Sequence, residues 1–355
     1  MTNIIQINLL SPGFKTPNGS AFLFPLIFFN NELKHSGIKI NFFSKFSSAI
    51  YGADIIAVDS KFHKFMWEEQ KQVIFQQFVE LKKNCDSLIY FDTTDSTGSL
   101  QTEILNYVDG YCKGQLLKNR KSYLKSFYGD RLYTDYIHKK FGVNDKKIQR
   151  SIPVKNKEHL KKLKISWNSG LADYSKFGPF WMKIYDYIPL NFFLGFKKLR
   201  PLKKNINIHS RFGINYSKDT VAWQRKKITN LLINLDKKKL SRLQYFSELL
   251  RSKIVISPFG WGEITLKDFE AFLCNNLLFK PSMDHLDTWP NFFVNNKTYC
   301  SFSWDFSDFI KKLQDIEKNF SDYLDIVNYG NQNYLEYASK NGAEKFVNHF
   351  SNILT

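Results

Sequence analysis

The chain has 355 residues, which is more than one hydrophobic core usually serves, so we expect two domains. Hydrophobic residues make up 43% of it and aromatic residues 17%, which excludes a disordered chain. The formal net charge of +18 suits phosphorylated substrates, anionic lipid or nucleic acid as partners. No helix-turn-helix, zinc finger or nucleic-acid-binding barrel is recognisable, so a nucleic-acid partner is not expected. The lysine-rich runs predict either a solvated surface or a patch that faces an anionic membrane.

The cysteines are far apart in the sequence and have no metal-ligand spacing; they are Cys85, Cys112, Cys274 and Cys300. They are typical of reduced thiols in a cytosolic protein. Neither a signal peptide nor a membrane-spanning run is visible. We therefore expect a cytoplasmic location, either free or peripheral on the inner face of the plasma membrane.

The first half alternates between apolar strands and helices. The expected strands are 4–10, 38–43, 55–58 and 87–91, and the expected helices are 21–34 and 67–83. This alternation predicts a parallel, doubly wound sheet. In such a sheet, ligands bind beyond the carboxyl ends of the strands.

The loop after the first strand contains Gly13 and Gly19. It lacks the G-x-G-x-x-G spacing of a dinucleotide site, so no such cofactor is expected. Because glycine has no Cβ, the backbone of this loop can approach a phosphate or a sugar closely. We therefore predict that Gly13 and Gly19 belong to an acceptor or phosphate loop.

The fourth strand ends in the most polar run of the first half, F-D-T-T-D-S-T-G. Asp92 or Asp95 could act as a general base for an acceptor hydroxyl if its pKa is raised. The same residues would also suit an Asx turn followed by a helix N-cap. His63 is a further candidate base, although a single histidine among lysine and phenylalanine is usually a surface residue.

An aromatic stretch with basic flanks occupies residues 177–200. It could lie in a lipid interface, or it could pack between domains. An anionic membrane surface is therefore one of the partners that the sequence allows.

Residues 241–290 form the most informative part of the chain. They predict a helix, a strand at 253–257, a turn at 258–262, a helix at 265–274 and a strand at 277–280. Apolar residues at helical spacing in the second helix indicate a βαβ unit. The turn at 258–262 and the loop at 281–289 leave the same edge of the sheet, where a ligand is expected.

The run SPFGWGEITLKDFEAFLCNNLLFKP resembles the donor-sugar signature of GT-B glycosyltransferases, in the group-1 and exostosin-like manner. The resemblance is convincing over residues 205–310. It implies an α/β chain of two Rossmann-like, doubly wound domains that face a cleft. Residues 1–200 would form the acceptor-side domain and residues 201–355 the nucleotide-sugar-binding domain, with the last helices packing back onto the first.

The resemblance also implies roles for individual residues. Glu270 matches the second acid of the signature, which holds ribose or sugar hydroxyls. The first acid usually stands eight residues earlier, where this chain has Gly262, and Glu263 comes one position late. Arg211 fits the basic residue that contacts the donor diphosphate, with Lys218 or Arg225 as a second cation. The donor-binding residues implied are Glu270, Arg211, Glu263, Gly260, Gly262, Lys218 and His285.

We therefore expect a glycosyltransferase that uses a UDP-, GDP- or CMP-linked sugar and a glycan or lipid-linked saccharide acceptor. The resemblance places it in assembly of a bacterial surface polysaccharide, either lipopolysaccharide or capsule. No D-x-D motif is present, so neither a metal nor another cofactor is expected. The alternatives are a basic membrane-surface or nucleic-acid-binding protein without catalysis, and a GT-B relative that binds donor without transferring it.

Overall fold

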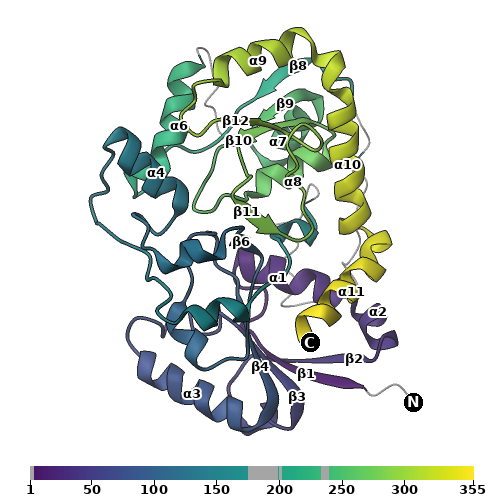
Figure 1. Ribbon diagram of the computed structural model, residues 1–355. Helices are drawn as coiled ribbons and strands as arrows, with labels where there is room; N and C mark the ends of the chain where they lie inside the picture. The colour runs from purple at the N-terminus through teal and green to yellow at the C-terminus, as the bar shows by residue number, and fades with distance from the viewer. Residues whose placement is uncertain (1–3, 175–198, 200–201, 233–239) are drawn as a thin grey trace.

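The computed structural model describes residues 4–174, 199, 202–232 and 240–355. Its strands form a six-stranded sheet and a four-stranded sheet, which lie in the lower and upper halves of Figure 1, together with a separate two-stranded sheet. Both larger sheets are parallel throughout. The prediction of two α/β domains is therefore confirmed.

The six-stranded sheet has the strand order β2-β1-β3-β4-β5-β7. Its strands are β1 (Ile5–Leu10), β2 (Ile38–Phe43), β3 (Ala53–Asp59), β4 (Cys85–Asp92), β5 (Gly110–Lys113) and β7 (Leu163–Ile165). The order reverses beside β1, as in a doubly wound sheet, so the connections from β1 and β3 lead in opposite directions along the sheet. The side-chain hydroxyl of Ser11 donates to Asp59 Oδ2 at 2.9 Å and joins the carboxyl ends of these two strands.

Helices cover both faces of this sheet. The helices α1 (Pro17–Phe28) and α2 (Asn30–His35) replace the single helix predicted at 21–34. The earlier start has a local cause, because Thr16 caps α1 by accepting from the Gly19 N–H and Pro17 suits the first turn. On the other face, α3 (Lys71–Lys83) begins later than the predicted 67 and packs through Ile74 and Phe78.

The four-stranded sheet has the sequential order β12-β10-β9-β8. Its strands are β8 (Ile206–His209), β9 (Ser252–Ile256), β10 (Leu277–Pro281) and β12 (Cys300–Phe302). The accompanying helices are α6 (Asp219–Leu231), α7 (Arg242–Arg251) and α8 (Leu266–Leu273). α8 connects β9 to β10 and starts with a capping box between Thr265 and Asp268, so the βαβ unit lies where the sequence predicts it.

The two halves are joined by a strand pair. β6 (Gln115–Leu117) of the first half pairs antiparallel with β11 (Leu286–Thr288) of the second, and the two lie side by side between the halves in Figure 1. The helix α4 (Leu132–Phe141) contacts α6 across the same boundary. Short 3₁₀ helices occupy Ser48–Ile50, Thr102–Asn106, Arg120–Leu124, Lys157–Lys162, Ser169–Leu171, Phe320–Tyr323 and Lys340–Gly342.

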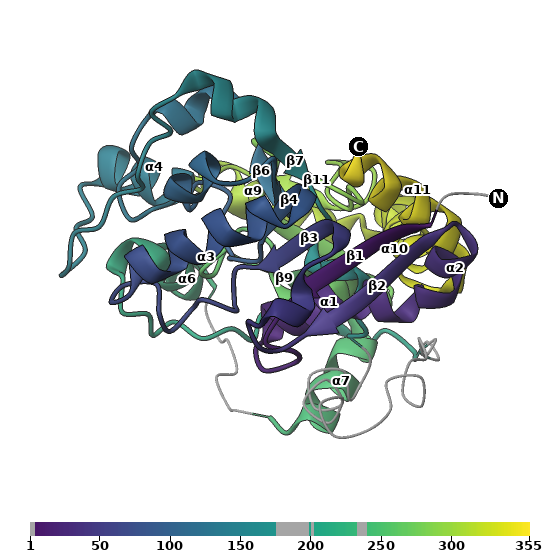
Figure 2. The same cartoon turned by 90° about the horizontal axis from the view of Figure 1, so that it is seen from below.

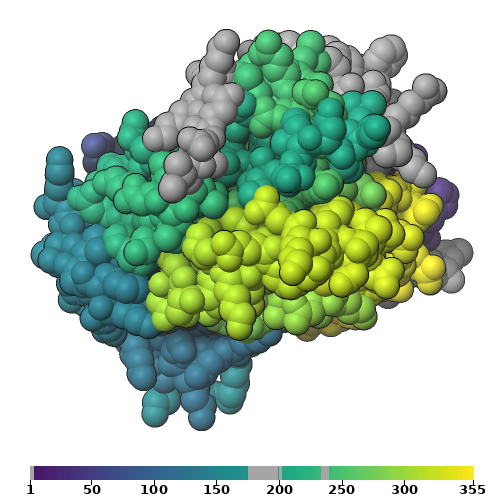
Figure 3. All heavy atoms as spheres, turned by 90° about the horizontal axis from the view of Figure 1, so that it is seen from above, coloured from purple at the N-terminus to yellow at the C-terminus, as the bar shows by residue number. Residues whose placement is uncertain are grey.

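The chain ends with α9 (Phe309–Lys318), α10 (Leu324–Ala338) and α11 (Ala343–Leu354). α9 and α10 contribute to the outer surface of the upper half, where residues after 300 form the yellow area of Figure 3. α11 returns to the first half, and the ring of Phe346 lies 5.2 Å from that of Phe29. α11 consequently lies beside α2 of the first half (Figure 2).

The domain boundary at 200/201 stays a prediction. It falls between β7 and β8, beside residues 175–198 and 200–201, which the structure does not describe. The aromatic, basic stretch predicted at 177–200 lies outside the described residues apart from Leu199. Within the described ranges, the helices are all too short or too polar to span a bilayer.

Candidate active site

A pocket lies at the carboxyl edge of the six-stranded sheet, against the second domain. It is lined by Asn18, Ala21, Phe22, Asp92, Thr93, Thr94, Asp95, Gly114, Gln115, Ser166, Trp167, Asn168, Ser169 and Ile264. The pocket is open to solvent, and its empty volume of about 520 Å³ includes this opening. Apart from Ile264, these residues come from α1, from the last residue of β4 and from the segments that follow β4, β5 and β7, as expected for an open α/β sheet.

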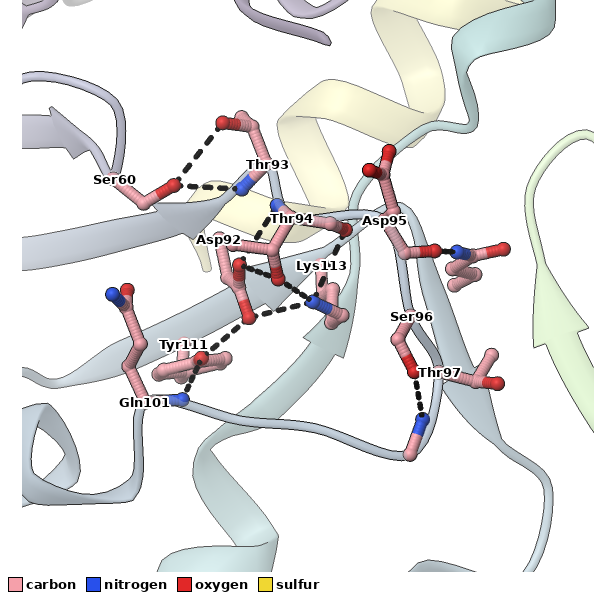
Figure 4. Close-up of polar contacts among 12 residues, drawn as sticks. Ser60, Asp92, Thr93, Thr94, Asp95, Ser96, Thr97, Gln101, Tyr111 and Lys113 are labelled. Carbon is pink, nitrogen blue, oxygen red and sulfur yellow. Dashed lines mark hydrogen bonds and ion pairs between the residues drawn. The ribbon is translucent and has the colours of Figure 1, made fainter. Parts of the chain in front are cut away.

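Asp92 lies at the base of this pocket, and both of its carboxylate oxygens accept hydrogen bonds (Figure 4). Lys113 Nζ and the Tyr111 hydroxyl each donate to Asp92 Oδ2 at 2.7 Å, while the Thr94 N–H donates to Oδ1 at 2.9 Å. Burial raises the pKa of Asp92, but the ammonium group and hydrogen bonds of Lys113 outweigh it, so the pKa is lowered overall. A carboxylate held this way is a weak base. Asp92 therefore fits a positioning role better than the predicted catalytic one.

Asp95 has a different environment, because it is exposed at the mouth of the same pocket. Its Oδ1 accepts from the side-chain amide of Asn18, and its backbone carbonyl accepts from Gln115 Nε2. Figure 4 shows the carboxylate of Asp95 pointing away from the Asp92–Lys113 pair. Of the two predicted bases, Asp95 is the one that a substrate hydroxyl can reach.

His63 is buried, unlike the surface residue that the sequence suggested. Its Nε2 lies 2.9 Å from Gln77 Oε1, its ring packs against Phe62 and Phe78, and it does not line the pocket. Desolvation lowers the pKa of His63. These contacts give His63 a packing role.

The predicted glycine loop is close to the pocket but tightly packed. Gly13 has a φ of 83°, which favours glycine. A Cβ on Gly19 would lie 2.9 Å from Thr16 Oγ1 and 3.7 Å from Asp59 Oδ2, so the chain itself occupies this space. Asp59 is buried and accepts from Ser11 and Thr93, and burial raises its pKa. Asn18, rather than either glycine, presents the polar group of this loop to the pocket.

The second domain presents Arg225 beside the turn that contains Gly260. Its guanidinium donates to the carbonyl oxygens of Phe259 at 2.7 Å and Gly213 at 2.9 Å, and it is 8% exposed. A Cβ on Gly260 would lie 3.2 Å from Arg225 Nη2, so glycine allows the guanidinium to approach the turn. Among the described residues, Arg225 has no carboxylate partner.

Lys267, which was not among the predicted site residues, is a second cation and is partly buried. Its Nζ donates to the carbonyl oxygen of Arg211, and it has no ion pair within the part of the chain that the structure describes. Both cations lie against one ring, with Lys267 Nζ 5.6 Å and the Arg225 guanidinium carbon 5.7 Å from the centroid of Phe212. Desolvation lowers the pKa of Lys267 to about 7. Lys267 lies in the first turn of α8, a helix that the sequence predicted, so this position could have identified it as a candidate.

Arg211 and Lys218, the cations that the resemblance favoured, are already compensated. Arg211 donates through Nε and Nη2 to Glu248 at 2.7–2.8 Å, and Lys218 Nζ lies 3.1 Å from Asp130 Oδ2. Hydrogen bonds from His209 and Arg211 lower the pKa of Glu248 to about 2. The charges of these two residues therefore contribute less to anion binding than those of Arg225 and Lys267.

Glu270 is buried in α8, where two side chains of α7 pair with it. Arg242 Nη1 donates to its Oε1 at 2.7 Å, and the Tyr245 hydroxyl donates to its Oε2 at 2.6 Å. A carboxylate has about four lone-pair positions, so two remain for a ligand. Its role in donor binding stays a prediction.

Glu263, Gly262 and His285 lie where the two domains touch. Glu263 is fully buried and accepts from the Thr97 N–H at 3.1 Å, with His285 Nε2 3.7 Å from its Oε1. Burial raises its pKa, but the nearby imidazole of His285 and the hydrogen bonds from Thr97 lower it overall. A Cβ on Gly262 would lie 2.2 Å from the carbonyl oxygen of Asp95, so the turn at 258–262 packs directly against the loop that contains Asp95.

Two parallel-sheet α/β domains facing each other across this interface form a fold of the GT-B type. No protein-family model matches the sequence, and no curated protein is similar to it. A glycosyltransferase from Rickettsia africae is among the similar solved structures, with 9% identity, 100% of each chain covered and a TM-score of 0.47. HepE from Anabaena, in complex with UDP and glucose, has 9% identity, 99% coverage of each chain and a TM-score of 0.45. An alpha-glucosyltransferase in complex with UDP and DNA has 8% identity, 99% coverage of each chain and a TM-score of 0.39.

Proposed function

We propose that this protein is a glycosyltransferase that binds the diphosphate of a nucleotide sugar with Arg225 and Lys267. The observation that carries the proposal is that these two cations lie together without a carboxylate partner in the described part of the chain. Arg225 is buried and Lys267 partly buried, so both lose hydration, and an anion that pairs with them directly would offset that cost. A diphosphate would supply that anion, and Arg225 would still have free N–H groups to donate to it.

The first domain supplies the other half of the proposed reaction. Asp95 would accept the proton of an acceptor hydroxyl, whose oxygen bonds to the anomeric carbon while the bond from that carbon to the diphosphate breaks. The two cations would stabilise the negative charge that develops on the leaving diphosphate. Gly262 lies in direct contact with the backbone of Asp95. This contact supports transfer of the sugar from a donor beside the turn at 258–262 to an acceptor hydroxyl beside Asp95.

The other predicted donor-binding residues also have roles in the proposal. Glu270 would bind hydroxyls of the ribose, and Gly260 would leave room beside Arg225. Glu263, Gly262 and His285 would hold the donor turn against the first domain, while Arg211 and Lys218 would shape the site through their ion pairs. Independence of metal, a role in surface-polysaccharide assembly and a cytoplasmic or peripheral location are parts of the proposal that rest on the sequence.

A screen for consumption of UDP-, GDP- and CMP-linked sugars tests this function. We expect slow hydrolysis of the sugars of one nucleotide class, together with an increase in melting temperature when that nucleotide binds. If no nucleotide raises the melting temperature at millimolar concentration and no sugar is released, the proposal is wrong.

Lys267 makes donor binding depend on pH. Its pKa of about 7 means that it carries its charge below that pH in the free protein. A bound diphosphate stabilises the charged form and raises this pKa, so binding above pH 7 takes up a proton. The affinity for UDP-glucose, or for the donor that the screen identifies, should therefore fall as the pH rises from about 7 to 9.

Titration calorimetry at several pH values measures this dependence. Lys267→Met should bind more weakly and lose most of the pH dependence, whereas Lys267→Arg should keep the affinity and also lose the dependence. An unchanged pH profile in Lys267→Met would show that Lys267 does not contact the diphosphate.

A further inference from the structure

The chemistry of the pocket beside Asp95 indicates what it accepts. Its polar lining consists mainly of uncharged hydroxyl and amide groups, contributed by Asn18, Thr93, Thr94, Gln115, Ser166, Asn168 and Ser169. Its charged lining residues are Asp92 and Asp95, and Asp92 is neutralised by Lys113. The ammonium group of Lys113 is taken up by Asp92 and Thr94, and Lys61, whose charge also acts on Asp92 and Asp95, does not line the pocket. An anionic ligand would therefore meet the carboxylate of Asp95 without a free cation in the lining.

Gln115 provides an unused hydrogen-bond acceptor at this pocket. Its Nε2 donates to the carbonyl oxygen of Asp95, and this bond fixes which end of the amide is the oxygen. Oε1 is buried and has no hydrogen-bond partner among the described residues, in a side chain that is 7% exposed. A buried acceptor without a donor is unfavourable, so a hydroxyl that enters the pocket would gain a partner and remove that penalty.

Aromatic rings form the apolar part of the lining. Phe22 and Trp167 both line the pocket and stack in parallel, with their centroids 5.1 Å apart and 4° between their planes. A sugar ring has an apolar C–H face and polar hydroxyl edges. A pocket that combines an aromatic wall with amides and hydroxyls matches both features.

We propose that this pocket is the subsite for an uncharged sugar residue of the acceptor, with Gln115 selecting a hydroxyl of that sugar. The inference rests on the proposed glycosyltransferase function and assigns its acceptor class. One hydroxyl of the sugar donates to Gln115 Oε1, and a neighbouring hydroxyl lies against the carboxylate of Asp95. Acceptors that place a phosphate or a uronic carboxylate here are rejected by Asp95.

Saturation-transfer NMR with the full-length protein tests the subsite. The probes are methyl glycosides of glucose, galactose and N-acetylglucosamine, compared with glucuronic acid and glucose 1-phosphate. At least one neutral glycoside should bind in the presence of saturating UDP-glucose, and neither acidic probe should bind there. Gln115→Leu should weaken binding of the neutral probe about three- to tenfold, which corresponds to the loss of one hydrogen bond to an uncharged group.

Two further variants make the result specific. Asn18 lies on the more exposed side of the pocket. Asn18→Ala should also weaken binding of the neutral glycoside, so the test stays valid if Gln115→Leu does not fold. Gln76→Leu makes the same side-chain change on the exposed face of α3 and should have no effect.

Each outcome decides the proposal. Three results would overturn it: binding of the acidic probes alone, an affinity in Gln115→Leu and Asn18→Ala equal to that of the wild-type protein, or displacement of the glycoside by UDP-glucose. UDP-glucose binding in the same samples reports on the donor site separately. If UDP-glucose binds and no neutral glycoside does, the acceptor assignment fails while the glycosyltransferase function stands. If no nucleotide sugar binds but a neutral glycoside does, the donor proposal fails and the pocket is still a sugar site.

Discussion

Replacing Asp95 with asparagine should lower the rate of sugar transfer by about 10²- to 10⁴-fold, the usual contribution of a general base. The substitution keeps the hydrogen bond from Asn18 possible but removes the group that accepts the proton of the acceptor. Donor affinity should change little, because the proposed diphosphate site consists of Arg225 and Lys267. Single-turnover assays with the identified donor and acceptor would separate the chemical step from binding.

The control for this variant is Ser96→Ala, in the same loop. The Ser96 hydroxyl lies 3.4 Å from the Asp130 carbonyl oxygen and accepts from the Gly98 N–H at 3.2 Å, so its loss perturbs the loop without removing a carboxylate. Ser96→Ala should retain most of the transfer rate. A rate in Asp95→Asn within a factor of two or three of wild type would exclude Asp95 as the base.

Removing Asp92 should destabilise the fold rather than act on catalysis directly. The side chains of Asp92 and Lys113 are both 0% exposed and their charged atoms lie 2.7 Å apart. Breaking a buried pair by removing one partner costs about 3–5 kcal/mol, because the other charge stays buried and uncompensated. Urea unfolding should show this loss of free energy in Asp92→Asn and in Lys113→Met.

The double variant Asp92→Asn with Lys113→Met is the informative comparison. It leaves neither charge behind, so it should recover much of the stability that either single variant loses. The lowered pKa of Asp92 also fixes the pH range of the effect. The contribution of the pair is present above the ordinary aspartate pKa of about 4 and is lost as the pH falls below it. Strictly additive losses in the double variant would mean that the two residues act independently.

The sequence predicted the parts of this protein that depend on short-range pattern. Alternating apolar runs predicted β1 to β4, and the helical spacing in 265–274 predicted the βαβ unit around α8. The polar run after β4 was correctly expected at a sheet edge, and both of its aspartates line the pocket. What pattern could not supply was which groups meet across long separations.

The partners of the charged residues show this most clearly. Asp92 and Asp95 look equivalent in the sequence, and only the fold brings Lys113 from β5 to one of them. Arg211 seemed the best diphosphate ligand by position, but α7 places Glu248 against it. Arg225 and Lys267, separated by 41 intervening residues, meet only because both lie against the ring of Phe212. The pairing of β6 with β11 is equally long-range and has no local signal.

The central claim is that Arg225 and Lys267 form the diphosphate site of a nucleotide sugar, and one titration tests it most directly. Calorimetry with UDP-, GDP- and CMP-sugars should show binding of one class to the wild-type protein. Arg225→Gln should weaken it roughly ten- to a hundredfold, since each charge-assisted hydrogen bond contributes about 1.5–3 kcal/mol. Arg150→Gln removes the same charge from an exposed position and should bind like wild type. Equal affinity in Arg225→Gln, or no binding of any nucleotide sugar by the wild-type protein, would contradict the claim.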